Sequence, residues 1–265
     1  MPKVSVVIPC FNQGHYIDEA VNSVLGQTFQ DFEIIIVNDG STDDFTNNHL
    51  NNYKKPKTKV ITTKNMGLAS ARNNGIREAT GEYILPLDAD DKIGGEYLEL
   101  AVDILDQNPE IGIVYCEAEF FEGRSGLWYL PEYSLVKILM SNVIFCSAFF
   151  RKSQWDKVGG YNPNMLNGFE DWDFWLSLIE LGAQVYRIPK VLFFYRIKNE
   201  SMILNLSKNK INSLKMFVQI IINHRELYFR NIEILNIALE EYIKNNKLSV
   251  YLQNLYIDTG SGFNE

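Results

Sequence analysis

Three carboxylates are clustered in the segment LDADD at residues 87–91, which directly follows an apolar run. Carboxylates this close together repel one another, which would raise their pKa values or open the loop. A hard divalent cation removes this conflict, because Mg²⁺ and Mn²⁺ prefer oxygen ligands and bind one or two carboxylates together with substrate phosphates. The alternatives are a solvated acidic turn and a helix N-cap. The segment therefore predicts a metal site at the end of a strand.

A second acidic pair, Glu170-Asp171, precedes a helical pattern much further along the chain. A carboxylate at this place can act as a general base that takes a proton from an attacking hydroxyl group. Alternatively, Glu170, Asp171 and Asp173 cap the helix and interact favourably with its dipole. The two acidic segments are therefore the first candidates for the chemistry of this chain.

The segments that would position these side chains alternate between strand and helix in the first half of the chain. Such alternation predicts a mostly parallel sheet with right-handed crossovers, in which ligands bind at the carboxyl ends of the strands. Residues 9–12, 38–41 and 88–91 follow three predicted strands, so we expect them to meet at one edge of the sheet. The predicted strands are 4–8, 32–37, 59–63 and 82–87, and the predicted helices are 15–25 and 68–79.

The second half of the chain also contains both predicted strands and predicted helices, and its amino-acid composition then changes. Residues 207–251 are rich in Lys, Asn, Ile and Leu, with apolar residues at helical spacing, and they predict two or three appended helices. The other predicted helices are 97–107, 155–158 and 169–181, and the predicted strands are 111–119, 143–151 and 185–195.

The composition narrows the class of protein. The chain has 265 residues, 46% of them hydrophobic, which suffices for a single α/β domain. The net charge of -8 argues against a nucleic-acid binder, and it requires a local source of positive charge for any diphosphate ligand. Cys10, Cys116 and Cys146 form no metal or disulfide pattern, so we expect buried thiols in a cytoplasmic protein. We expect neither a signal peptide nor an apolar stretch of the ~20 residues that would span a bilayer.

Five segments carry a resemblance to a known family. In order, they read VSVVIPCFNQ, IIIVNDGSTDD, NMGLASARNNGI, GEYILPLDADD and GGYNPNMLNGFEDWDFWLSL. Through them, residues 3–200 resemble the family 2 glycosyltransferases, which have the GT-A fold. The resemblance implies a Rossmann-like, mostly parallel α/β sheet flanked by helices, here with a C-terminal helical extension. We expect a catalytic domain at residues 1–205, divided into a nucleotide-binding half at 1–92 and an acceptor-binding half at 93–205, and the extension at 206–265.

The resemblance also implies an activity, that of an inverting hexosyltransferase. Such an enzyme transfers a hexose or an N-acetylhexosamine from a UDP-sugar to a glycan, a glycoprotein or a lipid-linked acceptor. Assembly of a surface polysaccharide or protein glycosylation is the expected setting. The appended helices are expected to form an oligomer contact or to dock peripherally at the inner face of the membrane.

The resemblance assigns the donor site residue by residue. Pro9 and Phe11 would line the uracil pocket, where an aromatic ring can stack on the base. Asp39 would accept the uracil N3–H. Arg72 would lie near the base and the acidic loop and hold carboxylates or a carbonyl group. The remaining donor contacts implied are Asn65 and Gly67, which would shape the same pocket, and Asp88 and Ala89.

The resemblance also assigns the metal and the base. Asp90 would bind Mn²⁺ or Mg²⁺ directly, with Asp88 at the ribose or in the metal's outer shell, and the ion would bridge the two phosphates. Asp171 would be the base. Glu170 would orient Asp171 or bind the acceptor. Trp172 would stack on an acceptor sugar, or pack in the core.

The chain departs from the family pattern where many members have Tyr-Arg-x-His. Here the segment is Tyr195-Arg196-Ile197-Lys198. A protonated lysine cannot bind a metal ion, so Lys198 would contact the diphosphate as a point charge or be a solvated side chain. His15, His49 and His224 have no ligand-like neighbours and are expected to be structural or exposed.

Two other classes stay open. A nucleotidyltransferase would show a Gly-rich, basic phosphate loop near the first strand, and PCFNQGHY has none; likewise, no GxGxxG of a dinucleotide-binding enzyme is present there. The other class is a catalytically inactive partner protein that binds a nucleotide-sugar. The acidic segments at 88–91 and 170–171 are both intact, which favours an active enzyme.

Overall fold

The structure is a computed structural model, and it describes residues 1–198 and 210–245. The strands and helices of the first half are β1 (Val4–Cys10), α1 (Ile17–Leu25), β2 (Phe32–Asp39), α2 (Asp44–Asn51), β3 (Thr58–Thr63), α3 (Leu68–Glu78), β4 (Tyr83–Pro86), β5 (Lys92–Ile93) and α4 (Tyr97–Gln107). Those of the second half are β6 (Ile111–Glu122), β7 (Gly126–Trp128), α5 (Leu135–Met140), β8 (Phe149–Arg151), α6 (Lys152–Val158), α7 (Glu170–Glu180) and β9 (Gln184–Ile197). The C-terminal helices are α9 (Lys210–Asn223), α10 (Arg225–Arg230) and α11 (Ile232–Asn245).

Within the described residues, one nine-stranded sheet runs through the molecule in the order β3-β2-β1-β4-β8-β6-β9-β5, with β7 paired to β6. The neighbours β3, β2, β1 and β4 are parallel, and so are β6 and β9. The short strands β5, β7 and β8 run antiparallel to their partners. The expected mostly parallel α/β sheet is therefore confirmed, with antiparallel strands added in its second half.

The centre of the core is β1, all seven residues of which are buried. Helix α3 packs against β1 and β2, and it can approach closely because residue 75 is glycine. A Cβ atom added at Gly75 would lie 2.3 Å from Val7 Cγ1. Helix α1 buries one stripe, formed by Ile17, Ala20, Val21 and Val24, at the spacing that predicted it.

One predicted strand is corrected. Of residues 143–151 only β8 is a strand, because side chains take the hydrogen-bonding groups of the rest. Trp175 Nε1 donates to the Ile144 carbonyl at 3.2 Å, and the Tyr97 hydroxyl donates to the Ser147 carbonyl at 2.8 Å. Asn142 Oδ1 accepts from the Ile144 N–H at 3.2 Å, which bends the chain at the start of the segment.

Helix α2 was not predicted, because its sequence is polar and buries only Thr46 and Leu50. Its start depends on capping: Asp43 Oδ1 accepts from the Thr46 N–H at 2.7 Å. The short elements α5, β5 and β7 were also absent from the predictions. Among short elements, tertiary contacts rather than local periodicity decide the conformation.

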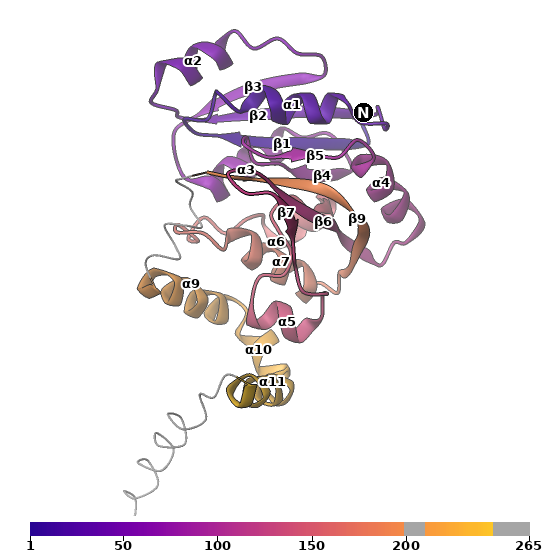
Figure 1. Ribbon diagram of the computed structural model, residues 1–265, viewed down its shortest axis with the longest axis vertical. Coiled ribbons are helices and arrows are strands. Elements are labelled where there is room, and N and C mark those ends of the chain that lie inside the picture. The colour runs from indigo at the N-terminus through magenta and orange to yellow at the C-terminus, as the bar shows by residue number, and fades with distance from the viewer. Residues whose placement is uncertain (199–209, 246–265) are drawn as a thin grey trace, which may run out of the picture.

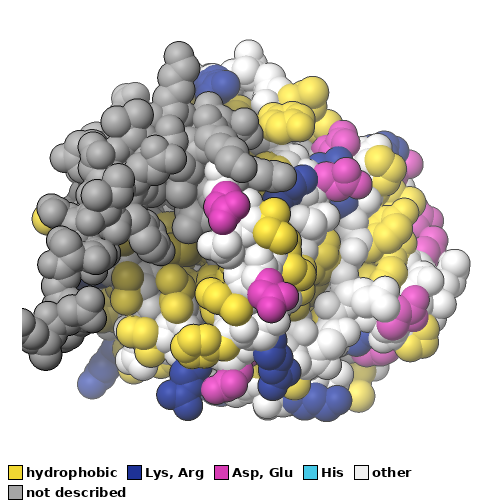
Figure 2. Space-filling view, turned by 90° about the horizontal axis from the view of Figure 1, so that it is seen from below, with side chains coloured by type: hydrophobic (Ala, Val, Ile, Leu, Met, Phe, Trp, Pro, Cys, Tyr) yellow, Lys and Arg dark blue, Asp and Glu magenta, His cyan; other side chains and the backbone are white. Residues whose placement is uncertain are grey.

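The C-terminal helices α9, α10 and α11 lie below the sheet, next to α5 (Figure 1). The three helices confirm the expected extension as far as it is described, whereas the boundary at 205/206 and residues 246–251 of the predicted helical segment lie outside the described residues. Figure 2 views the molecule from this end, and hydrophobic side chains are interspersed there with charged ones. Within the described part of the chain, no helix is both long enough and apolar enough to cross a membrane.

Candidate active site

Arg72 of α3 joins the two acidic segments. Its Nη1 donates to Glu170 Oε1 at 2.6 Å and its Nη2 donates to Asp88 Oδ1 at 2.8 Å. The guanidinium is fully buried, with its carbon 5.6 Å from the centre of the Tyr161 ring. Burial alone would lower the pKa of Arg72, but Asp88 and Glu170 raise it well above its ordinary value. One permanent cation therefore holds the predicted metal loop against the start of α7.

The three aspartates of the loop have different surroundings. Asp88 is the partner of Arg72, and its Oδ2 accepts a hydrogen bond from Cys146 Sγ at 3.4 Å. Asp90 forms an ion pair with Lys198. Asp91 is buried, and its Oδ1 accepts from the Arg196 N–H at 2.9 Å while its Oδ2 has no partner. Burial, followed by the charges of Asp90 and Asp88, raises the pKa of Asp91 well above its ordinary value.

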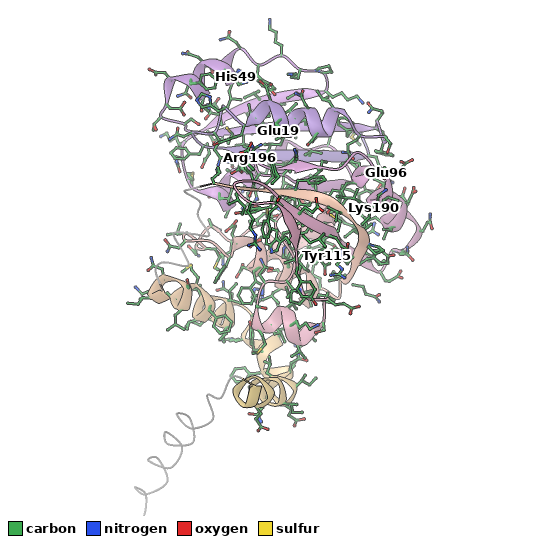
Figure 3. The ribbon with its side chains drawn as sticks, in the orientation of Figure 1. Glu19, His49, Glu96, Tyr115, Lys190 and Arg196 are labelled. Carbon is green, nitrogen blue, oxygen red and sulfur yellow. The ribbon has the colours of Figure 1, made fainter. Side chains whose placement is uncertain are left out.

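Arg196 of β9 is the second buried cation of the site and supports the loop from the other side. Its Nε donates to the Asp90 carbonyl at 2.6 Å, and its guanidinium forms ion pairs with Glu19 and Glu122. Figure 3 shows Arg196 close to Glu19, which comes from α1. Only 2% of the Arg196 side chain is exposed. The loop at 88–91 is therefore held between α3 and β9.

Asp171 lies in the first turn of α7, directly after Glu170. Its Oδ2 accepts from Asn142 Nδ2 at 3.0 Å and its Oδ1 accepts from the Trp172 N–H at 2.8 Å. Burial and then the charge of Glu170 raise the pKa of Asp171 to about 7, although Arg72 and these two hydrogen bonds lower it. A carboxyl group with this pKa is suited to accept and release a proton near neutral pH.

Cys146 lies between the two acidic segments. It is in contact with Asp88, and the charges of both Asp88 and Asp171 act on its thiol. Burial is the main cause that raises the pKa of this thiol well above its ordinary value, so that it stays neutral. The thiol therefore fills space between the carboxylates without adding charge.

The residues predicted to bind the uracil base lie at the ends of β1 and β2 and in the loop before α3. Asp39 is 3% exposed, and its Oδ1 accepts from Thr63 Oγ1 at 3.2 Å and from the Met66 N–H at 3.3 Å. Burial raises the pKa of Asp39. Asn65 Oδ1 accepts from the Gly67 N–H at 3.2 Å, at the start of α3. Phe11 is 43% exposed at the same edge of the sheet.

This edge depends on a glycine. Gly40 has a φ of 64°, and a Cβ added to it would lie 2.6 Å from the Asn65 backbone nitrogen. Only glycine adopts this conformation without strain and allows the approach. Pro9, by contrast, is buried within β1 and paired in register with Val37.

Two residues that were predicted to contact a ligand, Trp172 and Ala89, are buried. Trp172 is 3% exposed, its Nε1 donates to the Ile138 carbonyl at 2.6 Å, and its ring stacks on Phe217. Its role is therefore in the core rather than at an acceptor. Ala89 is fully buried, and its side chain packs inside. Glu170 is 5% exposed and paired with Arg72, which favours the positioning role over acceptor binding.

The residues present fit a metal ion that takes few protein ligands. Among the side chains that the structure describes, no group of three or more His, Cys, Asp or Glu is arranged to hold a metal alone. Each oxygen of Asp88 accepts one hydrogen bond, Asp90 is paired with Lys198, and Oδ2 of Asp91 has no hydrogen-bond partner. A divalent ion held by one or two carboxylates, with phosphates and water completing its shell, matches the usual chemistry of Mg²⁺.

Sequence reasoning missed Asn142 and did not assign Cys146 to the site. Neither lies in a recognisable motif, and they approach Asp171 and Asp88 only through the bent segment before β8. Arg196 could have been found, because it stands inside the Tyr-Arg-x-His pattern whose fourth position was considered. His224 is confirmed as structural, since it is 3% exposed and paired with Asp173 and Glu180.

Comparison with known proteins agrees with this geometry. Residues 5–164 match the family described as Glycosyl transferase family 2. The match covers more than half of the chain, and the chain belongs to glycosyltransferase family 2.

The fraction of each relative's length that aligns with this chain varies. It is 32% identical to the chondroitin synthase of Escherichia coli over 189 residues, an alignment that covers 69% of this chain and 27% of that protein. It is 29% identical over 241 residues to an uncharacterised glycosyltransferase of Haemophilus influenzae, covering 87% of this chain and 78% of that one. The chain thus spans only about a quarter of the E. coli synthase.

Solved structures share the fold. The crystal structure of S. aureus TarS 1-349 in complex with UDP-GlcNAc superposes with a TM-score of 0.64 at 23% identity, covering 76% of this chain and 60% of that one. The complex of the same protein with UDP gives a TM-score of 0.64 and covers 91% of this chain and 72% of that one. The GT-A fold expected from the resemblance is therefore confirmed.

Proposed function

We propose that this chain is an inverting glycosyltransferase that takes a hexose or an N-acetylhexosamine from a UDP-sugar, with Mn²⁺ or Mg²⁺ bound at Asp90. The observation that carries the proposal is the position of Arg72 between Asp88 and Glu170, which places Asp171 beside the acidic loop. The acidic loop and the segment with the proposed general base, which lie about 80 residues apart in the sequence, would thereby belong to one site. The complexes of S. aureus TarS with UDP and UDP-GlcNAc support the choice of donor.

The proposed reaction is a single displacement. Asp171 accepts the proton of the acceptor hydroxyl while that oxygen bonds to the anomeric carbon, and the bond from this carbon to the UDP oxygen breaks. The α-linked sugar of the donor becomes β-linked. A pKa of about 7 leaves Asp171 ionised often enough at neutral pH to act as this base. Asn142 Nδ2 and the Trp172 N–H donate to its carboxylate and hold it in place.

The departing diphosphate needs positive charge, which the chain as a whole lacks. Lys198 lies beside Asp90 and contributes an ammonium group as a point charge. A bound divalent ion would add Lewis-acid stabilisation of the charge that develops on UDP. Asp39 and Phe11 would bind the uracil base at the other end of the donor.

An aromatic wall replaces Trp172 as the candidate acceptor surface. Trp128 of β7 lies 5.0 Å from Tyr195 and 5.4 Å from Phe120, measured between ring centroids. Pairing of β6 with β7 and β9 places these rings on one face, since Phe120 lies opposite Tyr195. The charges of Asp91, Asp88 and Asp90 act on Tyr195, which supports a position of the wall near the acidic loop. Partly exposed aromatic rings suit the apolar face of a sugar. The acceptor is proposed to be a glycan, free or attached to protein or lipid.

The test is a panel of UDP-sugars assayed for UDP release, with Mn²⁺ or with EDTA. We expect release from at least one donor that EDTA abolishes and Mn²⁺ restores. Asp171→Asn should lose turnover but keep UDP affinity in calorimetry, and Asp103→Asn, an exposed aspartate on α4, is the matched control. Tight UDP binding without turnover by wild type would instead identify an inactive partner protein, and release of pyrophosphate would identify a nucleotidyltransferase.

A further inference from the structure

We propose that the C-terminal helices α9 and α10 hold the catalytic helix α7 in place, and that Asp173 is the positioning residue through which they do so. The inference rests on the proposed role of Asp171 as the base. It assigns a function to the extension, for which the sequence offered only an oligomer contact or membrane docking.

Asp173 is a buried carboxylate whose partners come from the C-terminal helices. It is 3% exposed, and its Oδ1 accepts from Asn223 Nδ2 at 2.6 Å and lies 3.3 Å from His224 Nε2. A buried charge is costly unless it is paired and hydrogen-bonded. The last residue of α9 and the residue that precedes α10 supply both interactions. Asp173 thus serves a tertiary contact rather than the helix cap that the sequence suggested.

His224 contacts α7 at both ends. Its Nε2 faces Asp173 in the first turn, and its Nδ1 lies 3.1 Å from Glu180 Oε2 in the last turn. These two acids are seven residues apart, so they lie on one face of the helix. Burial alone would lower the pKa of His224, but Asp173 and then Glu180 raise it above its ordinary value. One imidazole therefore lies against both the first and the last turn of α7.

Trp172, which directly follows Asp171, is held by the same helices. Trp172 stacks on Phe217 of α9, with ring centroids 5.7 Å apart. The Tyr228 hydroxyl of α10 donates to the Leu139 carbonyl at 2.7 Å, which fixes α5. Helix α5 leads directly to Asn142, the residue that donates to Asp171. The C-terminal helices therefore support the general base Asp171 in two ways. They contact α7, which carries it, and α5, which leads to Asn142.

The experiment uses the full chain with Asn223→Ala and His224→Gln. The control is His49→Gln, because His49 is a half-buried histidine, remote from α7, that also faces an aspartate, Asp18, at 3.1 Å. Figure 3 shows His49 on α2, at the opposite end of the molecule from α9 to α11. UDP-sugar hydrolysis, with water as acceptor, supplies kcat and KM, and calorimetry supplies the affinity for UDP.

We expect kcat to fall by roughly 10- to 100-fold in both variants, because displacement of a catalytic group by about 1 Å has an effect of this size. KM for the donor and affinity for UDP should stay within about twofold of wild type. Wild-type kcat in folded Asn223→Ala and His224→Gln would overturn the proposal. So would a loss of UDP affinity equal to the loss of kcat, since that would mean general disruption of the domain.

A second measurement separates this proposal from the proposed function. Carbon NMR titration of the Asp171 carboxyl group in wild type and Asn223→Ala needs no turnover. We expect the pKa near 7 of wild type to fall toward the ordinary value of aspartate in the variant, as α7 loosens and water reaches the carboxylate. An unchanged titration would overturn the positioning role even if the enzyme is active. A changed titration in a chain that turns over no UDP-sugar would support positioning and defeat the proposed function.

Discussion

Replacement of Arg72 by methionine tests the central link of the site. The substitution keeps most of the side-chain volume but removes the cation, and it leaves Glu170 and Asp88 without their partner. Glu170 has a side chain that is 7% exposed, so its charge stays buried and unpaired. Removal of one member of a buried ion pair costs about 3–5 kcal/mol. The side chain of Asp88 is 26% exposed, so water compensates it in part and it adds less.

The expected loss is therefore roughly 3–5 kcal/mol in the free energy of unfolding. A natural domain has only about 5–15 kcal/mol in total, so the variant should fold but with a small margin. Urea denaturation followed by circular dichroism measures the loss. Lys59→Met is the control, because Lys59 and Glu78 form an exposed pair whose side chains are 54% and 48% accessible. It should lose less than about 1 kcal/mol.

The double variant Arg72→Met/Glu170→Gln decides whether the reasoning is right. If the cost comes from the unpaired charge of Glu170, neutralising that residue should restore about 1–3 kcal/mol relative to Arg72→Met alone. Strictly additive losses, or a loss below about 1 kcal/mol in Arg72→Met, would refute the assignment of Arg72 as the electrostatic link.

Three further predictions concern the reaction. Because Asp171 must be ionised to act as a base, kcat should rise with pH through about 7. Asn142→Ala removes a hydrogen bond that lowers the pKa of Asp171, so it should move this rise to higher pH in a pH–rate profile. Lys198→His should reduce the Mn²⁺ concentration for half-maximal UDP binding, since it replaces the ammonium beside Asp90 with a metal ligand; an unchanged Mn²⁺ titration would speak against a metal at Asp90. Trp128→Ala should raise the acceptor KM by about two- to tenfold with donor hydrolysis unchanged, and an unaltered acceptor KM would exclude the aromatic wall.

Much of the fold could be predicted from the sequence, because its elements are long and strongly patterned. The buried runs of β1 and β2 and the apolar stripe of α1 lie within a few residues of their predicted bounds. Prediction failed where a contact from elsewhere decides the conformation. In residues 143–148, Trp175 and Tyr97 take the carbonyl groups that a strand would have used. In α2, one capping aspartate and the burial of Leu50 suffice.

The candidate site divides in the same way. The sequence by itself was enough to predict which groups would carry the chemistry, since the carboxylates of residues 88–91 and 170–171 stand in short local motifs. Only the tertiary structure decided their partners. Arg72 meets Asp88 and Glu170 across 16 and 98 residues of chain, and Asp173 meets Asn223 across 50. Local sequence patterns indicate burial and backbone preference. The pairing of charges depends on how distant segments pack against one another, which no short stretch of sequence specifies.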